Sequence, residues 1–469
     1  MLNRDIEYIE NDGFDRHEIF FYKANDIPAV VSTLKPARGQ KFGESLTFSF
    51  FKNVFLPQGF PESVHKDYVA YQIWDTLQAF ASTINGTLTT HSIMRGVGVG
   101  ESSATPLAAA ITWIMKDGTG MIGRIIFAWW QGNNLDSQCK KWRLFADILN
   151  DVAMSIEVML PYLSSSFLSY SLYTLCLTTG MKAIVGIAGG ATRVAIMQHH
   201  AIKDNMADVS AKEHSQGTLV NLAGSIVGIL ILLVVPEKLF IYLCFILVIV
   251  HVISNYYGVT SLEINTLNED RLCLVIEDFL VDQSISRVED INKRESVFLF
   301  LEKPSKKIFG FNIEIGGSLQ QVLQWGLIQS QDVWCLLNLF QTRKFLPVVN
   351  LKTRKIYIIL TEDVNDTDIL KAYFHSCIYA LMICQIKNLR CEALTKMQWS
   401  GSSYVNHNKV QEIATRLNDD ELVLPGELVL ALDQIALQEY NSFSKVLNES
   451  DWIVKSNMLP VKQWRGTWR

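Results

Sequence analysis

The sequence predicts a mainly α-helical membrane protein with a separate α+β domain at its C-terminal end. The first observation is a pair of uncharged apolar runs, Thr218 to Val235 and Leu239 to Tyr257, separated only by Pro236-Glu237-Lys238. Each run is close to the ~20 residues that a helix needs to cross about 30 Å of hydrocarbon, and the break is long enough only for a turn. The second observation is that the apolar excess lies between Asp67 and Tyr257. The expected parts are an N-terminal cytosolic segment, 1–54, a membrane domain, 55–261, and a C-terminal cytosolic domain, 262–469.

Composition agrees with a chain that is only partly embedded in a membrane. The hydrophobic fraction of 49% and the charged fraction of 19% are unusual for a soluble enzyme but too mild for a protein that is membrane throughout. The net charge of -5, without a basic tract, argues against nucleic acid as a partner. The eight cysteines form no CxxC pair, which predicts reduced thiols and no zinc site. The acidic segment Met1 to Asp12 has no apolar core, so neither a secretory signal nor a transit peptide is expected there.

Four further helices are predicted before the hairpin, which gives about six transmembrane helices. They are expected at Tyr68 to Met94, Pro106 to Trp130, Trp142 to Leu160 and about Phe167 to Met197. The connecting segments support this count, because short cytosolic loops are enriched in Lys and Arg. The basic residues in the second and fourth of these segments are Lys140, Lys141, Arg143, Lys203 and Lys212. Their alternation places both termini on the cytosolic side of a membrane that the sequence does not identify.

The C-terminal domain combines strand-like and helical patterns. Phe345 to Asn350 and Lys355 to Thr361 indicate a strand pair around a short turn, and Asp366-Thr367-Asp368 caps a long helix, Ile369 to Ile386. Further strand-like or helical pieces are expected at Cys273 to Leu280, Asn312 to Gly316, Asn408 to Leu417 and Glu427 to Leu447. No nucleophile and base pair stands out, so we expect a regulatory or interaction module and not an enzyme.

Seven ionisable residues are predicted at or near membrane depth. Such groups normally face the interior of a helix bundle, where they pair or line a polar cavity. A spacing of four places Asp147 and Asp151 on one helix face. One interpretation is a binding cavity for a small charged metabolite, in which the cations attract an anion and the carboxylates act as counter-ions or proton sites. The other is a set of structural ion pairs. The candidates are Asp75, Lys116, Asp117, Arg124, Asp147, Asp151 and Arg193.

The segment from Lys203 to Ser215 is the second candidate site. It is interpreted as a cytosolic gate or as a docking loop for a partner, and the alternative is a solvated amphipathic helix. Its candidate residues are Asp204, Asn205, Asp208 and Lys212.

Three other patterns are weaker. The run Gly96 to Gly100 lacks the Walker lysine and is expected to be a turn, and Asp117-Gly118-Thr119-Gly120 falls inside an apolar helix, where catalysis is not expected. The three residues His199, His200 and His214 suggest a metal site, but paired histidines beside a helix end are interpreted as interfacial polar groups, so no metal is expected.

Seven sequence blocks occur in a specific order. They are Leu56 to Val64, Tyr71 to Phe80, Gly96 to Thr105, Lys116 to Met121, Trp142 to Asp151, Gly189 to Arg193 and Asp204 to Lys212. Together they resemble the shared domain of the root UVB sensitive (RUS) family over Phe55 to about Asp270. The resemblance implies a eukaryotic membrane-associated protein, related to plant proteins that are needed for root growth under ultraviolet-B and linked to vitamin B6 homeostasis.

The same resemblance implies ligands and partners but no established reaction. Pyridoxal phosphate or a related vitamer is a candidate ligand through the resemblance alone, and no cofactor is expected. The expected partners are the lipid bilayer, a small charged metabolite, and a second copy of this chain or another RUS-family chain.

A further resemblance, to one half of a major facilitator transporter, comes from the helix count. The run Gly132 to Asp136, followed by Lys140 to Arg143, resembles the Gly-x-Leu-x-Asp loop of those transporters, and Lys182 ahead of Gly186 resembles their Arg-x-x-x-Gly pattern. A lone half needs a partner half to enclose a pathway. The leading hypothesis is therefore a non-enzymatic carrier, and the alternative is a membrane adaptor that assembles protein partners through its cytosolic domain.

Overall fold

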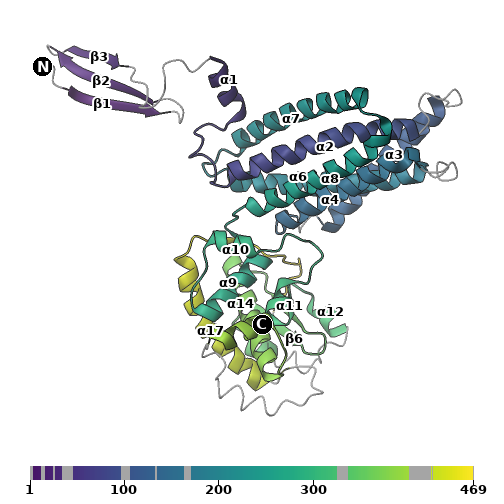
Figure 1. Ribbon diagram of the computed structural model, residues 1–469. Coiled ribbons are helices and arrows are strands. Elements are labelled where there is room, and N and C mark those ends of the chain that lie inside the picture. Colours follow the sequence, from purple (N-terminus) through teal and green to yellow (C-terminus); the bar gives the residue numbers. More distant parts are fainter. Residues whose placement is uncertain are drawn as a thin grey trace. The chain divides into compact units, whose positions relative to one another are not determined.

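The computed structural model describes residues 4–11, 16–24, 27–33, 46–96, 106–131, 135–162, 171–324, 336–400, 424 and 426–467. The chain divides into two compact units, one made of residues 1–135 and 139–262 and the other of residues 136–138 and 263–469. Both units are mainly helical (Figure 1).

Six long helices form the bundle of the first unit, where they lie side by side (Figure 1). They are α2 (Tyr68–Gly96), α3 (Pro106–Gln131), α4 (Cys139–Met159), α6 (Ser171–His200), α7 (Met206–Val234) and α8 (Phe240–Ser261). All six predicted helices are thus present. Their starts differ from the prediction where polar residues continue a helix: α4 begins at Cys139, and α7 begins at Met206 instead of Thr218. Two single turns of 3-10 helix, Leu160–Tyr162 and Glu237–Leu239, follow α4 and precede α8.

Three segments of this bundle are long and apolar enough to cross a membrane, namely Leu172–His200, Met206–Val234 and Glu237–Ser261. Helix α14 (Asp366–Ile386) of the second unit is also long and apolar enough to cross a membrane. However, 83% of its most apolar stretch is buried within that unit, so its side chains contact protein. Within the described residues, α2, α3 and α4 do not meet the criterion. The six crossings and the resemblance to half of a transporter stay predictions.

The bundle packs closely where small residues of α7 face α2. A Cβ atom at Gly224 would lie 2.9 Å from the Cβ of Thr83, and a Cβ atom at Gly228 would lie 2.8 Å from the Cβ of Thr87. Glycines four apart are a known means of bringing two helices into close contact. The outer faces of α3, α7 and α8 expose large apolar side chains. A surface of this kind is typical of contact with lipid or with another protein.

An antiparallel sheet near the N-terminus was not predicted from the sequence. Its strands are β1 (Arg4–Asn11), β2 (Arg16–Ala24) and β3 (Ile27–Thr33), in that order, with Glu7 opposite Phe20. Helix α1 (Leu46–Phe55) follows in the chain.

The second unit is built around a three-stranded sheet. Strand β7 (Lys355–Leu360) lies between β5 (Asn312–Ile315), which is parallel to it, and β6 (Phe345–Asn350), which is antiparallel. The predicted strand pair is therefore confirmed. Helix α14 packs on this sheet, and α17 (Gly426–Asn448) packs on α14. The smaller elements are β4 (Thr266–Asn268), α9 (Glu269–Asp282), α10 (Val288–Arg294), α11 (Pro304–Phe309), α12 (Leu319–Gln324), α15 (Glu392–Ser400) and β8 (Ile453–Met458).

One prediction for this unit needs correction and another lies outside the described residues. The capping residue of α14 is Asn365, one position before the predicted cap, and it forms a capping box with Asp368. The segment Cys273 to Leu280, for which a strand and a short helix were both open, is part of helix α9. The helix predicted at Asn408 to Leu417 falls outside the residues that the structure describes.

Candidate functional site

A row of charged side chains lies inside the bundle, where α2 faces α4. The Nη2 atom of Arg143 donates a hydrogen bond to Oδ1 of Asp75 at 3.0 Å, and the Nε atom of Arg143 lies 3.3 Å from Oδ2 of Asp147. Gln78 donates to the same Oδ1 of Asp75 at 2.9 Å. The side chains of this cluster, together with Tyr71 and residues of α8, leave no room for a water-sized molecule between them.

The row continues along α4 by steps of four residues, which keeps its members on one helix face. Nδ1 of His251, on α8, lies 2.7 Å from Oδ2 of Asp151, and both side chains are almost fully buried. Asn255 donates to the carbonyl oxygen of His251 at 3.1 Å. Further along, Lys182 of α6 pairs with the buried Glu157 at 2.5 Å.

The structure brings together only some of the seven residues predicted to bind a metabolite. Asp75, Asp147 and Asp151 belong to the row, whereas Arg193 lies 3.8 Å from Glu213 near one end of the bundle.

The three candidates on α3 are not part of the row. The Nζ atom of Lys116 lies 4.5 Å from the ring centroid of Trp113, while Asp117 and Arg124 are exposed on the surface of the helix. The seven residues therefore occur in local groups instead of around one cavity.

Sequence reasoning missed Arg143 because it was counted among the charges of a loop. In the structure Lys140, Lys141 and Arg143 all belong to α4, and the first two are buried, with 1% and 8% of their surface exposed. Lys140 donates to the carbonyl oxygen of Leu262 at 2.8 Å. These three charges therefore say less about the side of the membrane than the loop argument assumed.

The second candidate site lies at the beginning of α7. Its side chains form hydrogen bonds with the backbone of the segment that precedes α2. Asn205 donates to the carbonyl oxygen of Ser63 at 3.1 Å, and Asp208 accepts from the backbone N–H of Gln58 at 2.7 Å. Lys212 donates to the carbonyl oxygen of Asn53, and Asp204 adopts a left-handed conformation with φ of 52°. These contacts fasten the segment before α2 to the beginning of α7.

A cluster of histidines and carboxylates lies beside this contact, and the sequence analysis interpreted part of it differently. His199 and His200 were expected to be interfacial polar groups, but their side chains are 6% and 0% exposed. His214, by contrast, is exposed. Both buried rings face Asp67, which lies just before α2, and this carboxylate was not singled out from the sequence. A histidine and an aspartate two residues apart are a weak signal when the remaining members are more than one hundred positions away.

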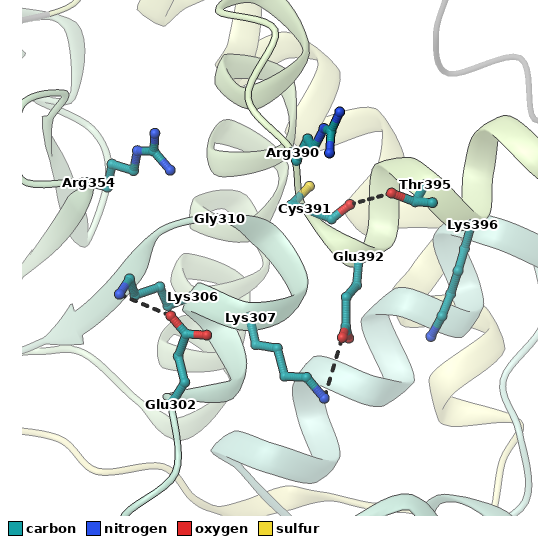
Figure 2. A pocket seen from close by; sticks show the side chains of 10 residues that line it. All are labelled: Glu302, Lys306, Lys307, Gly310, Arg354, Arg390, Cys391, Glu392, Thr395 and Lys396. Atoms are coloured by element: carbon teal, nitrogen blue, oxygen red, sulfur yellow. Dashed lines mark hydrogen bonds and ion pairs between the residues drawn. The ribbon is translucent and has the colours of Figure 1, made fainter.

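The second unit contains a hollow of about 700 Å³ with a basic lining (Figure 2). Five cationic and two anionic side chains line it. Lys306 and Lys307 of α11 pair with Glu302 and Glu392 at 2.9 and 3.4 Å. The lining residues are Glu302, Lys306, Lys307, Gly310, Arg354, Arg390, Cys391, Glu392, Thr395 and Lys396.

Two arginines of this hollow make no ion pair with any described residue. Arg354 ends the turn between β6 and β7 with φ of 51°, and Arg390 precedes α15. Cys391 lies next to Arg390 in Figure 2 and immediately precedes α15. A hydrogen bond from the Cys384 thiol, with further bonds from the backbone N–H groups that follow Cys391, holds the pKa of the Cys391 thiol below its usual value despite burial. The hollow thus combines positive charge with an acidified thiol.

Comparison with known proteins gives two matching family models. One, described as a vitamin B6 photo-protection and homoeostasis domain, matches residues 43–283, and the other, described as the C-terminal part of root UVB sensitive proteins, matches residues 284–468.

Similar proteins are found in an amoeba and a plant. The chain is 40% identical over 272 residues to RUS family member 1 of Dictyostelium discoideum. The aligned region covers 57% of this chain and 50% of that protein. It is 34% identical over 337 residues to protein root UVB sensitive 3 of Arabidopsis thaliana, which covers 70% of this chain and 74% of that protein. It is 30% identical over 319 residues to the Arabidopsis protein root UVB sensitive 2, chloroplastic, which covers 68% of this chain and 69% of that protein. No solved structure matches the chain.

Proposed function

The chain belongs to the root UVB sensitive family, and we propose that it is a non-enzymatic membrane carrier for a small charged metabolite. The observation that carries this proposal is the row of Asp75, Arg143, Asp147 and Asp151, partly or fully buried inside a bundle with apolar outer faces. Ionisable groups inside such a bundle are costly, and membrane proteins retain them mainly on substrate, ion or proton pathways. The structure then corresponds to a closed state, because the row leaves no room for a ligand.

The charges of the row provide a means of opening it. Arg143 is shared by the carboxylates of Asp75 and Asp147, so the three groups together carry one negative charge. A movement that separates Asp75 from Arg143 would make the guanidinium available to an anionic ligand. Separation of α2 from α4 and α8 on one side of the membrane at a time would give alternating access to this position.

The basic hollow of the second unit supports an anionic metabolite as the ligand. Its volume of about 700 Å³ lies within the range of small-molecule sites, which is roughly 300–1,000 Å³. Arg354 and Arg390 present guanidinium groups, which suit bidentate binding of a phosphate. The family model that matches residues 43–283, outside the hollow, is described by vitamin B6 homoeostasis, so we propose a phosphorylated vitamer such as pyridoxal phosphate as the first ligand to test.

Ligand-dependent stabilisation of the purified full chain in detergent tests this proposal. A ligand that binds only the folded protein raises its melting temperature by mass action. Pyridoxal phosphate should stabilise the wild type more than pyridoxal does, and Arg143→Lys, which keeps the charge but loses the planar fork, should reduce the effect. The double variant Arg354→Gln/Arg390→Gln separates binding in the hollow from binding in the row. Full ligand stabilisation in Arg143→Lys would remove the carrier assignment from the row.

A second candidate function, that of a membrane adaptor, is favoured by two observations. The seven predicted site residues lie in local groups without a shared cavity, which fits a structural role. In addition, the second unit exposes three neighbouring apolar side chains, Phe298, Phe300 and Leu301, at 51%, 80% and 61%. Exposed apolar groups of this kind are typical of a surface for a partner. If the protein is an adaptor, Phe300→Ser/Leu301→Ser should abolish cellular function while Arg143→Lys retains it.

A further inference from the structure

The cluster at the end of the bundle unites three separate parts of the first unit. His65 and Asp67 precede α2, His199 and His200 end α6, and Glu213 lies near the start of α7. Four of these side chains are at most 6% exposed, and that of His65 is 20% exposed. Their burial together requires that their polar atoms be satisfied locally.

Asp67 is the centre of this cluster. Its Oδ1 atom lies 2.7 Å from Nδ1 of His65, and its Oδ2 atom lies 2.8 Å from Nε2 of His199. One ligand atom from each of these three residues can be chosen so that all lie within 4.8 Å of one another. Imidazole nitrogens combined with a carboxylate oxygen are a donor set that suits zinc and neighbouring divalent transition metals.

His200 provides an independent observation that points to a ligand. Its side chain is 0% exposed, yet neither ring nitrogen has a hydrogen-bond partner among the described residues. Its Nε2 atom lies 3.6 Å from Oδ1 of Asp67, and its Nδ1 atom lies 3.6 Å from Oε1 of Glu213. Both distances are too long for hydrogen bonds, and a buried polar group without a partner requires an explanation.

A metal ion accounts for the spacing between His200 and Asp67, whereas the 2.7 and 2.8 Å from Asp67 to His65 and His199 are hydrogen-bond distances, which would lengthen when a metal replaces the shared protons. Two ligand atoms on a tetrahedral zinc ion with bonds of about 2.1 Å are roughly 3.4 Å apart, which is close to the distance between His200 and Asp67. Glu213, whose Oε1 atom lies 3.6 Å from Nδ1 of His200, is placed on the far side of the ring, where a carboxylate commonly orients a metal-binding histidine. Tyr68 and Tyr71 pack against the His200 ring, with ring centroids 5.3 Å away in each case, and hold it in this orientation.

We propose that His65, Asp67, His199 and His200 form a binding site for a divalent transition-metal ion of the zinc class, with Glu213 as the positioning residue for His200. The site joins the segment before α2 to the ends of α6 and α7, so the metal fixes that end of the bundle. This inference does not depend on the carrier proposal, because none of its five residues belongs to the buried row.

Metal binding by the full chain in detergent, purified without a histidine tag, tests the proposal. After treatment with a chelator and addition of zinc, the wild type should retain one zinc per chain by mass spectrometry. Cobalt in its place should give the intense visible absorption of tetrahedral coordination. His65→Ala and Asp67→Asn should lose the metal, and Glu213→Gln should weaken its binding by roughly 10- to 100-fold.

His214→Ala is the matched control, because this histidine is exposed and is the chain neighbour of Glu213. It should bind zinc like the wild type. X-ray absorption at the zinc edge of the wild type, which needs no variant and is therefore independent of folding defects, should report three imidazole ligands. Less than a tenth of an equivalent of zinc in folded wild type, or equal retention by His65→Ala and His214→Ala, would overturn the proposal.

Discussion

Arg143 is the cation that the carboxylates of the row share. Two carboxylates, those of Asp75 and Asp147, depend on this single guanidinium. Arg124, on the exposed surface of α3, shares no such contact with the carboxylates of the row. Arg143 and Arg124 therefore make a matched pair for measuring the effect of burial.

Arg143→Gln should destabilise the folded protein by about 3–5 kcal/mol, because it leaves buried carboxylates without a cation. Arg124→Gln should not destabilise the protein, because Arg124 is on the outer surface of α3, where a guanidinium facing lipid is itself costly. Melting temperatures in detergent give the comparison. The triple replacement of Asp75 and Asp147 by Asn and of Arg143 by Met should recover much of the loss. Equal melting temperatures for the two single variants would show that the row does not contribute to stability.

The thiol of Cys391 should react at lower pH than an ordinary cysteine. Its pKa is lowered by the hydrogen bond from Cys384 and by the backbone N–H groups at the start of α15, and only the thiolate reacts with iodoacetamide. The alkylation rate should therefore rise with pH and level off below the usual thiol range. Cys384→Ala should move this profile to higher pH, whereas Cys244→Ala, in the other unit, should not. Mass spectrometry gives the extent of alkylation of Cys391 at each pH. Identical pH profiles in wild type and Cys384→Ala would contradict the role of Cys384 in lowering the pKa of Cys391.

At the scale of elements, the contact between α2 and α7 depends on glycines. Gly228 faces Thr87 so closely that an added Cβ atom would lie only 2.8 Å from the threonine Cβ, whereas nothing lies within 4 Å of a Cβ atom added at Gly217. Both residues are on α7, so the same substitution has opposite effects at the two positions.

Gly228→Ala should cost about 1–3 kcal/mol, because the two helices must move apart. Gly217→Ala should stabilise the protein by up to about 1 kcal/mol, because alanine is the better helix former and the position is open. Melting temperatures of the two variants, each compared with the wild type, provide the measurement. A stabilising effect at both positions would show that the two helices are not in close contact.

The helices could be predicted where composition alone decides them, and their ends could not. The uncharged runs of α7 and α8 are visible in the sequence, but for the polar residues from Met206 onward the sequence left a loop and an amphipathic helix open, and the structure shows the helix. The capping box at Asn365 and Asp368 could be located only to within one residue, because several neighbouring side chains are suitable caps. The sheet of β1, β2 and β3 was missed, although Asp12-Gly13 and Asn25-Asp26 in its connections are turn signals.

Most of the candidate site could not be predicted, because its members are distant in the sequence. The face of α4 that carries Asp147 and Asp151 follows from helical spacing. The partners of these residues, Arg143 and His251, and the approach of His199 to Asp67 depend on how helices pack. Spacing within one helix carries no information about such contacts.

At the scale of the whole molecule, the arrangement across the membrane is a prediction with a direct test. Six crossings place the connection after the third helix on the opposite side from the C-terminus. Tags inserted after Leu163 and after Arg469 should therefore differ in accessibility to an impermeant label in sealed vesicles. Accessibility of both tags from the same side would contradict six crossings and the proposed half of a transporter.

The central claim is that the bundle carries a small anionic metabolite, and flux into proteoliposomes tests it most directly. Vesicles that contain the purified full chain should take up radiolabelled pyridoxal phosphate in a saturable manner. Uptake should depend on the planar guanidinium of Arg143, which suits bidentate binding of a phosphate. It should fall at least tenfold in Arg143→Lys, while Arg124→Gln retains it. Uptake equal to that of protein-free vesicles would contradict the carrier proposal.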